Sequence, residues 1–414
     1  MPKLMNKKQE IKNRIDLINK GEVPEGYKCC WGYFYPADWS IKKLKDLFNK
    51  VKTKNTDNNT LPVLTNSATQ GVILQDEYFD REIVNDDNAD GYYIVEDGDF
   101  MYNPRISSNA PAGPINRNHL GKNGIASPLY TVFRAKRDKN IEFIENYFKS
   151  NYWHRYMKSV SNQGARHDRL NLTDDDFMNM PIPQPSEKEQ EKIAEILCCC
   201  DKVIELKEKL LDEKQKEFIS AINKYIYDKN NNANLKKIGD ICDILDNRRI
   251  PLNDGERLYK KGEIPYYGAN GILDYIDQYL FDEDLVLLAE DGGYFDEYYK
   301  RPIAQYITGK SWINNHAHIL RAKNGENRYL YYALIHKNIL SILNGGGRVK
   351  LNQADLKKIK IPYPEKNIQE TIARILSKYE YKIGLLQQEL EHYKQLKKSL
   401  SQLLLTGIVR VNEV

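Results

Sequence analysis

Two stretches of the chain share one pattern of apolar positions. In the later stretch, apolar residues follow alternating three- and four-residue steps from Ile372 to Leu404. The earlier stretch keeps the same register from Ile193 to Tyr225. A heptad pattern sustained over several turns predicts long helices that pair along an apolar seam. The predicted seam residues are Ile193, Leu197, Ile204, Leu211, Ile372, Leu376, Ile383, Leu386 and Leu390.

The two patterned stretches belong to an internal repeat. Pro183 matches Pro362 and Gln190 matches Gln369, at a constant offset of 179 residues. A Pro-x-Pro segment precedes each helix, and Gly407 directly follows the second one. Each helix of roughly 42 residues would be about 63 Å long. Two matched helices in one chain are present at high effective concentration, which favours intramolecular pairing; two separate homodimeric coiled coils are the alternative.

A large module precedes each helix, and both modules mix short β-rich runs with turn signals before they end in helices. Strands are expected at residues 61–64, 92–95, 129–133, 284–288 and 317–320, and short helices at residues 143–148 and 329–334. The fold class predicted is therefore α/β (α+β), with two modules of mixed sheet and helix separated by two long antiparallel coiled-coil helices.

The repeat also predicts the domain boundaries. The two modules begin with similar runs, at residues 41–47 and 235–241. That offset is larger than the offset at the helices, so the first module is the longer one. The boundaries are 1–40 for an N-terminal segment, 41–185 for the first module, 186–234 for the first long helix, 235–364 for the second module, and 365–414 for the second long helix with a C-terminal tail.

The composition is that of a soluble protein with a mild positive charge. The chain has 414 residues, of which 41% are hydrophobic and 29% charged, with a net charge of +4. No apolar run approaches the roughly 20 residues that span a bilayer, and no secretory signal is recognisable, so we expect a cytoplasmic protein without a membrane partner. The net charge permits a nucleic-acid partner without demanding one.

Candidate chemistry is sparse. The six cysteines form no C-x-x-C pair, and the consecutive cysteines at 198–200 point about 100° apart on a helix, so a zinc site is not expected. The sequence contains no G-x-G-x-x-G, no G-x-x-x-x-G-K-[ST] and no H-E-x-x-H motif. Asp284, Glu290 and Asp291 could form a metal-binding carboxylate set, but a turn after a buried strand is the simpler interpretation. We therefore expect no catalytic residues, no metal and no cofactor.

A turn from glycine through arginine to leucine closes each module. It occupies residues 164–172 in the first module and 345–352 in the second, and Arg169 matches Arg348 at the 179-residue offset. Two divergent modules, each followed by a Pro-x-Pro-x-x-x-x-Gln-x-x-Ile-Ala helix, resemble the specificity subunit of type I restriction-modification systems. The resemblance covers nearly the whole chain, and residues 127–130, 267–271 and 312–316 are similar to common patterns in that family's recognition domains.

This resemblance implies a non-catalytic protein that reads DNA. Each module would be a target recognition domain that binds one half of a bipartite, asymmetric site in double-stranded DNA. The helices would set the distance between the halves and dock two methyltransferase subunits, and a restriction subunit could join them. S-adenosylmethionine, ATP and magnesium are then expected only on partner subunits. A coiled-coil adaptor that binds proteins alone is the competing hypothesis.

Residue chemistry suggests which side chains contact DNA. Arginine and lysine pair with guanine or phosphate, and asparagine and glutamine pair with adenine. The candidates are Gln70, Asn103, Arg105, Arg166 and Arg169 in the first module, and Asn270, Asn314, His316, Arg348 and Lys350 in the second. Arg169 and Arg348 could instead hold each module on its helix, because they recur where sequence-reading residues should differ. Asn314 and His316 could belong to a buried turn whose side chains bond the backbone.

Overall fold

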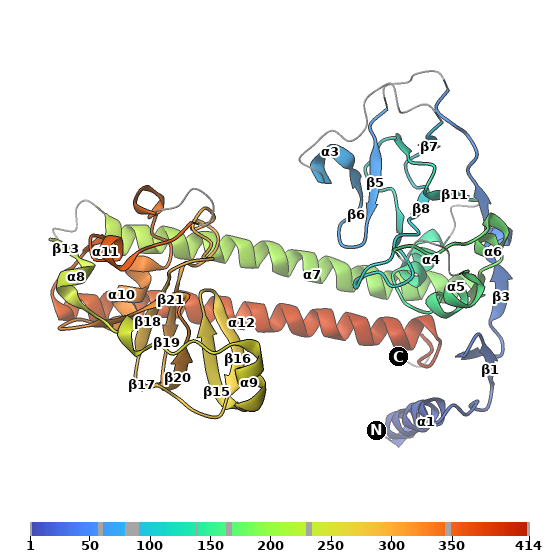
Figure 1. Ribbon diagram of the computed structural model, residues 1–414. Helices are drawn as coiled ribbons and strands as arrows, with labels where there is room; N and C mark the ends of the chain where they lie inside the picture. Colours follow the sequence, from blue (N-terminus) through green and yellow to red (C-terminus); the bar gives the residue numbers. More distant parts are fainter. Residues whose placement is uncertain are drawn as a thin grey trace. The chain divides into compact units, whose positions relative to one another are not determined.

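The computed structural model describes residues 2–56, 61–78, 91–136, 140–162, 168–228, 234–343 and 349–411, with side chains from residue 7 onward. The chain forms two compact units. One comprises Met1–Glu205 with His392–Val414, and the other comprises Leu206–Glu391. Both long helices therefore contribute residues to each unit (Figure 1).

The first unit is built on a four-stranded antiparallel sheet. Its strand order is β4-β11-β8-β9, with β4 at Phe48–Lys50, β11 at Thr131–Ala135, β8 at Phe100–Tyr102 and β9 at Ile115–Arg117. One face of the sheet carries Phe100 and Phe133, which stack at 5.4 Å and contact Phe148 of α4 (Ile141–Phe148) edge-on. This aromatic packing joins the sheet to its covering helix.

Short elements surround this sheet. They are α1 (Pro2–Asn19), β1 (Tyr27–Cys30), β2 (Tyr33–Pro36), α2 (Leu44–Leu47), β5 (Leu64–Ser67), β6 (Gly71–Leu74), α3 (Gln75–Tyr78), β7 (Tyr93–Val95), β10 (Gly124–Ala126), α5 (His154–Val160) and α6 (Asp174–Met178). Three two-stranded antiparallel pairs, β1–β2, β5–β6 and β7–β10, complete this part of the unit.

The second unit repeats the four-stranded sheet in the same order. Here the order is β14-β21-β18-β19, with β14 at Cys242–Ile244, β21 at Ala317–Ala322, β18 at Leu285–Ala289 and β19 at Ala304–Ile307. The central strand β18 is buried along its whole length, as expected for a continuous apolar run. The helix α10 (Asn327–Leu334) covers this sheet, in the place that α4 takes in the first unit (Figure 1).

A further sheet occurs in the second unit. Its order is β16-β15-β20-β17, and β15 and β20 run parallel while the other pairs are antiparallel. The strands are β15 (Lys261–Gly268), β16 (Gly271–Ile276), β17 (Phe281–Asp282) and β20 (Lys310–Ile313). The remaining short elements are α8 (Ile238–Ile241), η3 (Asp246–Arg248), α9 (Asp254–Tyr259), η4 (Leu340–Ile342) and α11 (Gln353–Leu356).

The first and last strands of each module pair with each other. In the first module β3 (Ser40–Lys43) is antiparallel to β12 (Pro181–Gln184), and in the second β13 (Leu235–Lys237) is antiparallel to β22 (Lys360–Pro362). A long helix follows β12 and β22 directly. The predicted repeat is thus a structural one, because each module closes on itself before the helix begins.

The long helices are α7 (Glu187–Ile222), which continues as the π-helical η2 (Asn223–Tyr227), and α12 (Lys366–Leu405). They pair antiparallel in both units. In the first unit Asp201 forms an ion pair with Lys397, and in the second Lys207 Nζ lies 2.7 Å from Glu389. Farther along α7, Phe218 stacks on Tyr379, near the start of α12. As residue numbers rise in α7, those of its partners in α12 fall, so these two helices of one chain run antiparallel.

The predicted seam residues are all buried or half-buried. Ile193, Leu197, Ile372, Leu376 and Leu390 expose 8% or less of their surface. The half-buried members are Ile204, Leu211, Ile383 and Leu386. The shared pattern of apolar positions therefore lies toward the interior of each unit.

Two matched glutamines hydrogen-bond to the segments that precede the long helices. Gln190 Nε2 donates to the carbonyl oxygen of Pro185 at 2.8 Å, and Gln369 Nε2 donates to that of Pro364 at 2.7 Å. Both glutamines are buried, so each satisfies a carbonyl that solvent does not reach readily. The repeated spacing of proline and glutamine thus has a structural reason.

The C-terminal tail returns to the N-terminal segment within the first unit. Gly407 takes a left-handed φ of 66°, as expected of a residue just past a helix, and the Tyr27 hydroxyl donates to its carbonyl at 2.6 Å. Arg410 then bonds both Glu189 and Asp38, at 2.7 to 3.0 Å. The tail thereby joins the start of α7 to residues that precede the first module.

The predicted short elements are confirmed in type, with shifted ends. The strand expected at residues 61–64 instead occupies Leu64–Ser67, since Pro62 has no N–H to contribute to a ladder. The helix expected at 329–334 starts two residues earlier, where the Glu326 side chain accepts from the Arg328 N–H. Among the described helices, none is both long enough and apolar enough to cross a bilayer.

Candidate nucleic-acid interface

In the first module, a cluster of amides fixes the β5–β6 hairpin. Asn66 donates to two backbone carbonyls, at 2.7 and 3.0 Å, and accepts from Asn116 at 2.7 Å. Asn103 donates to the Asn66 carbonyl at 3.1 Å and is 9% exposed. The cluster holds the hairpin against the main sheet, so Gln70 lies exposed at a supported turn. Of the two candidates here, Gln70 is accessible to a partner, whereas the buried Asn103 side chain is hydrogen-bonded to the backbone of Asn66.

Arg105 and Arg169 meet across an isolated antiparallel bridge. The bridge is made by the Leu170 N–H, which donates to Pro104 at 2.9 Å, and the Ile106 N–H, which donates to Asp168 at 2.9 Å. Residues directly opposite each other in such a pairing project to the same face. Arg105 is exposed, and Arg169 Nε lies 3.5 Å from the Asp168 carboxylate. Two arginine side chains thus share one face, and the Asp168 carboxylate adjoins Arg169.

A cleft of about 510 Å³ opens beside this arginine pair. Arg169 and Asn171 form part of its wall together with three tyrosines, Tyr93, Tyr102 and Tyr130. The Tyr130 hydroxyl lies 3.1 Å from Thr65 Oγ1, which fixes that ring. Arginine with aromatic rings and amides is a combination suited to the edges, faces and phosphates of nucleotides.

In the second module, the candidate residues gather around the turn at 290–293. Asn270 donates to the Gly292 carbonyl at 2.8 Å. The His316 Nδ1 lies 2.6 Å from Asp291, and Lys350 Nζ lies 2.9 Å from Glu290. Three elements that are distant in sequence therefore converge on one turn after β18.

Asn314 stands apart from this group because it is almost fully buried. It is 4% exposed, its Oδ1 accepts from the His316 N–H at 2.8 Å, and its own N–H donates to Tyr267 at 3.0 Å. Its side chain shapes the loop that carries His316. His316 itself is half-buried and lies at the accessible side of that loop.

A buried network supports the turn from beneath. Arg249 forms an ion pair with Glu290 and donates to the Ala317 carbonyl at 2.9 Å. His318, 1% exposed, bonds Asp246 at 2.7 Å through Nδ1. Burial by itself raises the pKa of both carboxyls. Hydrogen bonds from Arg249 and Lys350 to Glu290, and from His318 to Asp246, more than offset this, so both pKa values lie below the ordinary range.

Arg249, Asp246 and His318 are residues that the sequence did not single out. The tandem arginine at 248–249, shortly after the strand β14, is a signal that could have drawn attention to this place. Glu290, considered above as a metal ligand, is instead paired with two cations. Within the described ranges, no group of three histidine, cysteine or acidic residues is arranged to hold a metal ion. Arg166 and Arg348 lie outside the described residues.

The sequence matches a known family twice. The type I restriction modification DNA specificity domain matches residues 36–214 and again residues 230–395. Together these matches cover most of the chain, and each includes one module and most of the following helix. The chain therefore belongs to this family and carries two DNA specificity domains in tandem.

Named relatives agree with this assignment. A type I restriction enzyme specificity subunit of Haemophilus influenzae is 39% identical over 142 residues, which cover 34% of this chain and 36% of that relative. The specificity subunit of the type I restriction enzyme MjaVIII of Methanocaldococcus jannaschii is 23% identical over 437 residues, covering 94% of this chain and 97% of the relative. The similarity thus extends over both modules and both helices.

Solved structures share the fold. A chain from a study of assembly and conformational transition of a type I restriction-modification system aligns with a TM-score of 0.56 at 15% identity, over 91% of this chain and 99% of that one. The S subunit of the type I system of M. genitalium aligns with a TM-score of 0.55 at 16% identity, over 89% and 96%. By family and by fold, the chain is a specificity subunit of the type I restriction-modification kind.

Proposed function

We propose that each of the two specificity domains binds one half of a bipartite, asymmetric DNA site. The antiparallel helices α7 and α12 would fix the distance between the halves and dock two methyltransferase subunits. The repeated architecture supports this proposal, because the same sheet order and the same closing strand pair occur twice, each time directly before a long helix. Two modules on stiff helices suit a pair of half-sites at fixed spacing.

The observation that carries the DNA-binding part is the pairing of Arg105 with Arg169. Like charges directly opposite each other on neighbouring strands are destabilising. An anion between the two guanidinium groups would offset that repulsion. Guanidinium groups match both phosphate oxygens and the O6/N7 edge of guanine, so DNA supplies suitable ligands.

The differences between the modules support an asymmetric site. The first module presents the β5–β6 hairpin with Gln70 and the arginine pair. The second presents the turn at 290–293 with Asn270, His316 and Lys350. Different donors and acceptors on a common scaffold would read different half-sites, since sequence is read by the hydrogen-bonding pattern at base edges.

The chain would have no turnover of its own. S-adenosylmethionine, ATP and magnesium would be bound by the partner subunits, and a restriction subunit could join the complex. We expect the protein in the cytoplasm, together with the DNA that it reads. A coiled-coil adaptor that binds only proteins remains the competing hypothesis, but its function gives no reason for two divergent modules.

The test is methylation-site sequencing of DNA from cells that express this chain with its cognate methyltransferase subunit. The expected result is one bipartite motif with a fixed unspecified gap. Exchange of residues 235–364 for the corresponding module of another specificity subunit should then change one half of the motif and leave the other half intact. If a bound and active methyltransferase modifies no such motif, the proposal fails and the adaptor hypothesis gains support.

A further inference from the structure

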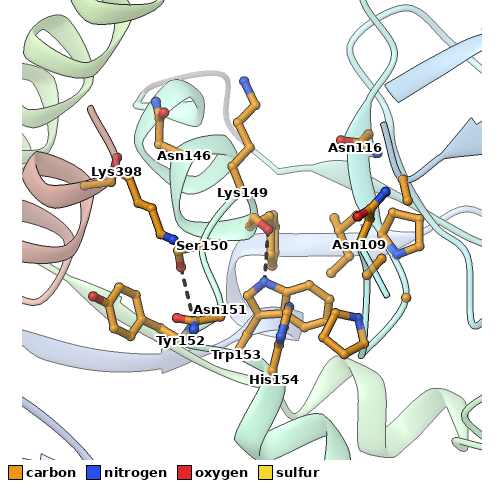
Figure 2. Close-up of a pocket in the computed structure, with 18 of the residues that line it drawn as sticks. Asn109, Asn116, Asn146, Lys149, Ser150, Asn151, Tyr152, Trp153, His154 and Lys398 are labelled. Carbon is orange, nitrogen blue, oxygen red and sulfur yellow. Dashed lines mark hydrogen bonds between the residues drawn. The ribbon is translucent and has the colours of Figure 1, made fainter. Parts of the chain in front are cut away.

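A second cleft in the first unit is lined by part of a long helix. Its volume is about 760 Å³. One wall comes from the loop at 108–116, another from the end of α4 and the following residues 149–154, and a third from the last turns of α12 (Figure 2). Lys398 of α12, Lys149 and Asn109 are among the side chains placed around it (Figure 2).

The lining is strongly basic. It contains Lys149, Lys394, Lys397 and Lys398, and no aspartate or glutamate. Lys394 and Lys398 are one helical turn apart, so both lie on the same side of α12. Burial, and then Lys158, lower the pKa of His154 to about 4, so this lining residue adds no charge at neutral pH. The positive charge of the cleft therefore comes from lysines alone.

The lysines of the cleft differ in whether they already form ion pairs within the chain. Lys149 Nζ lies 2.8 Å from Glu145, and Lys397 is paired with Asp201. Lys398 is exposed and forms no hydrogen bond or ion pair with the part of the chain that the structure describes. The lining also contains amide and hydroxyl groups, among them Asn109, Asn116, Ser150 and Gln402, beside apolar and aromatic residues. Such a surface offers many hydrogen-bond donors to an extended anion.

The cleft adjoins the candidate interface of the first module. Ala68, in the β5–β6 turn two residues before Gln70, forms part of its wall. Asn116, which donates to Asn66 and fixes that hairpin, is also part of the lining. A polyanion that contacts the hairpin can therefore continue into the cleft.

We propose that this lysine cleft binds backbone phosphates of duplex DNA beside the half-site of the first module. The inference rests on the proposed function and adds to it a contact made by the spacer helix α12. Ammonium groups act on phosphates as point charges, so this contact would position the DNA without reading sequence. Continuity with the hairpin favours DNA over an acidic segment of a partner protein as the occupant.

Comparison of the two repeats indicates that only one of them can make this contact. At the 179-residue offset, Lys394 corresponds to Gln215 and Lys398 to Ile219 on α7. The first copy of the helix, α7, thus lacks both lysines. The phosphate contact would therefore form beside the half-site of the first module only. The DNA on the two sides of the site would then be held by different contacts.

The experiment measures duplex affinity against salt for the full chain in complex with its methyltransferase subunit. The variants are K398Q and K394Q/K398Q, and K382Q is the control because Lys382 is an exposed lysine of α12 outside the cleft. Lysine and glutamine have similar helix propensity, so the fold is preserved. Each lost phosphate contact should lower the salt slope by about 0.9 and weaken binding by about fivefold at 0.15 M salt.

The expected loss for K394Q/K398Q is the same on the cognate site and on unrelated duplexes, while K382Q binds as wild type does. Unchanged affinity and slope would overturn the inference, and so would a loss confined to the cognate sequence. Weaker binding of the methyltransferase subunit with unchanged DNA binding would assign the cleft to an acidic protein segment instead. If the wild-type complex shows no site preference at all, the proposed function itself fails.

Discussion

The buried Gln369 at the start of α12 gives a sharp test of how the repeated motif works. Its side chain is 1% exposed; Nε2 donates to the Pro364 carbonyl at 2.7 Å, and Oε1 accepts from the Glu326 N–H at 3.0 Å. Gln369→Ala removes both hydrogen bonds. The Pro364 carbonyl and the Glu326 N–H then lack a partner in a place with little access to water. Each unsatisfied group costs about 1–3 kcal/mol, so we expect a loss of about 2–6 kcal/mol in unfolding free energy.

The assay combines thermal melting with amide hydrogen exchange. A loss of about 3 kcal/mol lowers the Tm of a unit of this size by about 6–12 °C. Because a chain with two units need not unfold in one step, exchange at the Glu326 N–H provides the local readout. The control is Gln387→Ala, at an exposed position of the same helix. Unchanged melting and undiminished protection of the Glu326 N–H would refute the reasoning.

Three further predictions concern the core, the pH dependence and the DNA surface. Leu376→Ala should cost about 2–5 kcal/mol in urea unfolding, because Leu376 is fully buried, whereas Leu385→Ala at an exposed position should cost far less. The lowered pKa values of Glu290 and Asp246 stabilise the fold above the unfolded-state pKa values of about 4, and this contribution is lost as pH falls through the folded-state values. Glu290→Gln should therefore lower the Tm more at pH 7 than at pH 3. Arg169→Glu should weaken duplex binding by at least about 1–3 kcal/mol, measured as Kd at fixed salt.

Each of these has an outcome that contradicts it. Equal costs for Leu376→Ala and Leu385→Ala would mean that the α7–α12 seam is misplaced. If Glu290→Gln lowers the Tm equally at pH 7 and pH 3, ionisation of Glu290 does not contribute to the stability of the fold. Wild-type affinity of Arg169→Glu, with its melting unchanged, would exclude the arginine pair from the interface.

The two repeats share the parts that attach each module to its helix and differ in the loops between those parts. Strand pairs β3–β12 and β13–β22 and the capping glutamines recur at matched positions, because they attach each module to its helix in the same way. The loops between them differ in length and chemistry. One module can therefore differ from the other in its loops while both attach to their helices in the same way.

The long helices and the repeat could be predicted from sequence alone. Apolar residues at heptad spacing leave few other structures available to a soluble chain, and matched prolines and glutamines mark where each helix begins. The observed helices α7 and α12 start at Glu187 and Lys366, close to the expected positions. Local chemistry was sufficient because capping and periodicity act over a few residues.

The candidate site depended on tertiary structure. Sequence could propose Arg105 and Arg169 separately, but only a bridge between distant segments sets them opposite each other. It could not show that Asn103 and Asn314 are buried, or that Arg249 supports the turn at 290–293. Burial and long-range pairing follow from which loops the sheets bring together. A single sequence without known contacts specifies the type of a polar residue, whereas the fold decides whether that residue faces a partner or its own backbone.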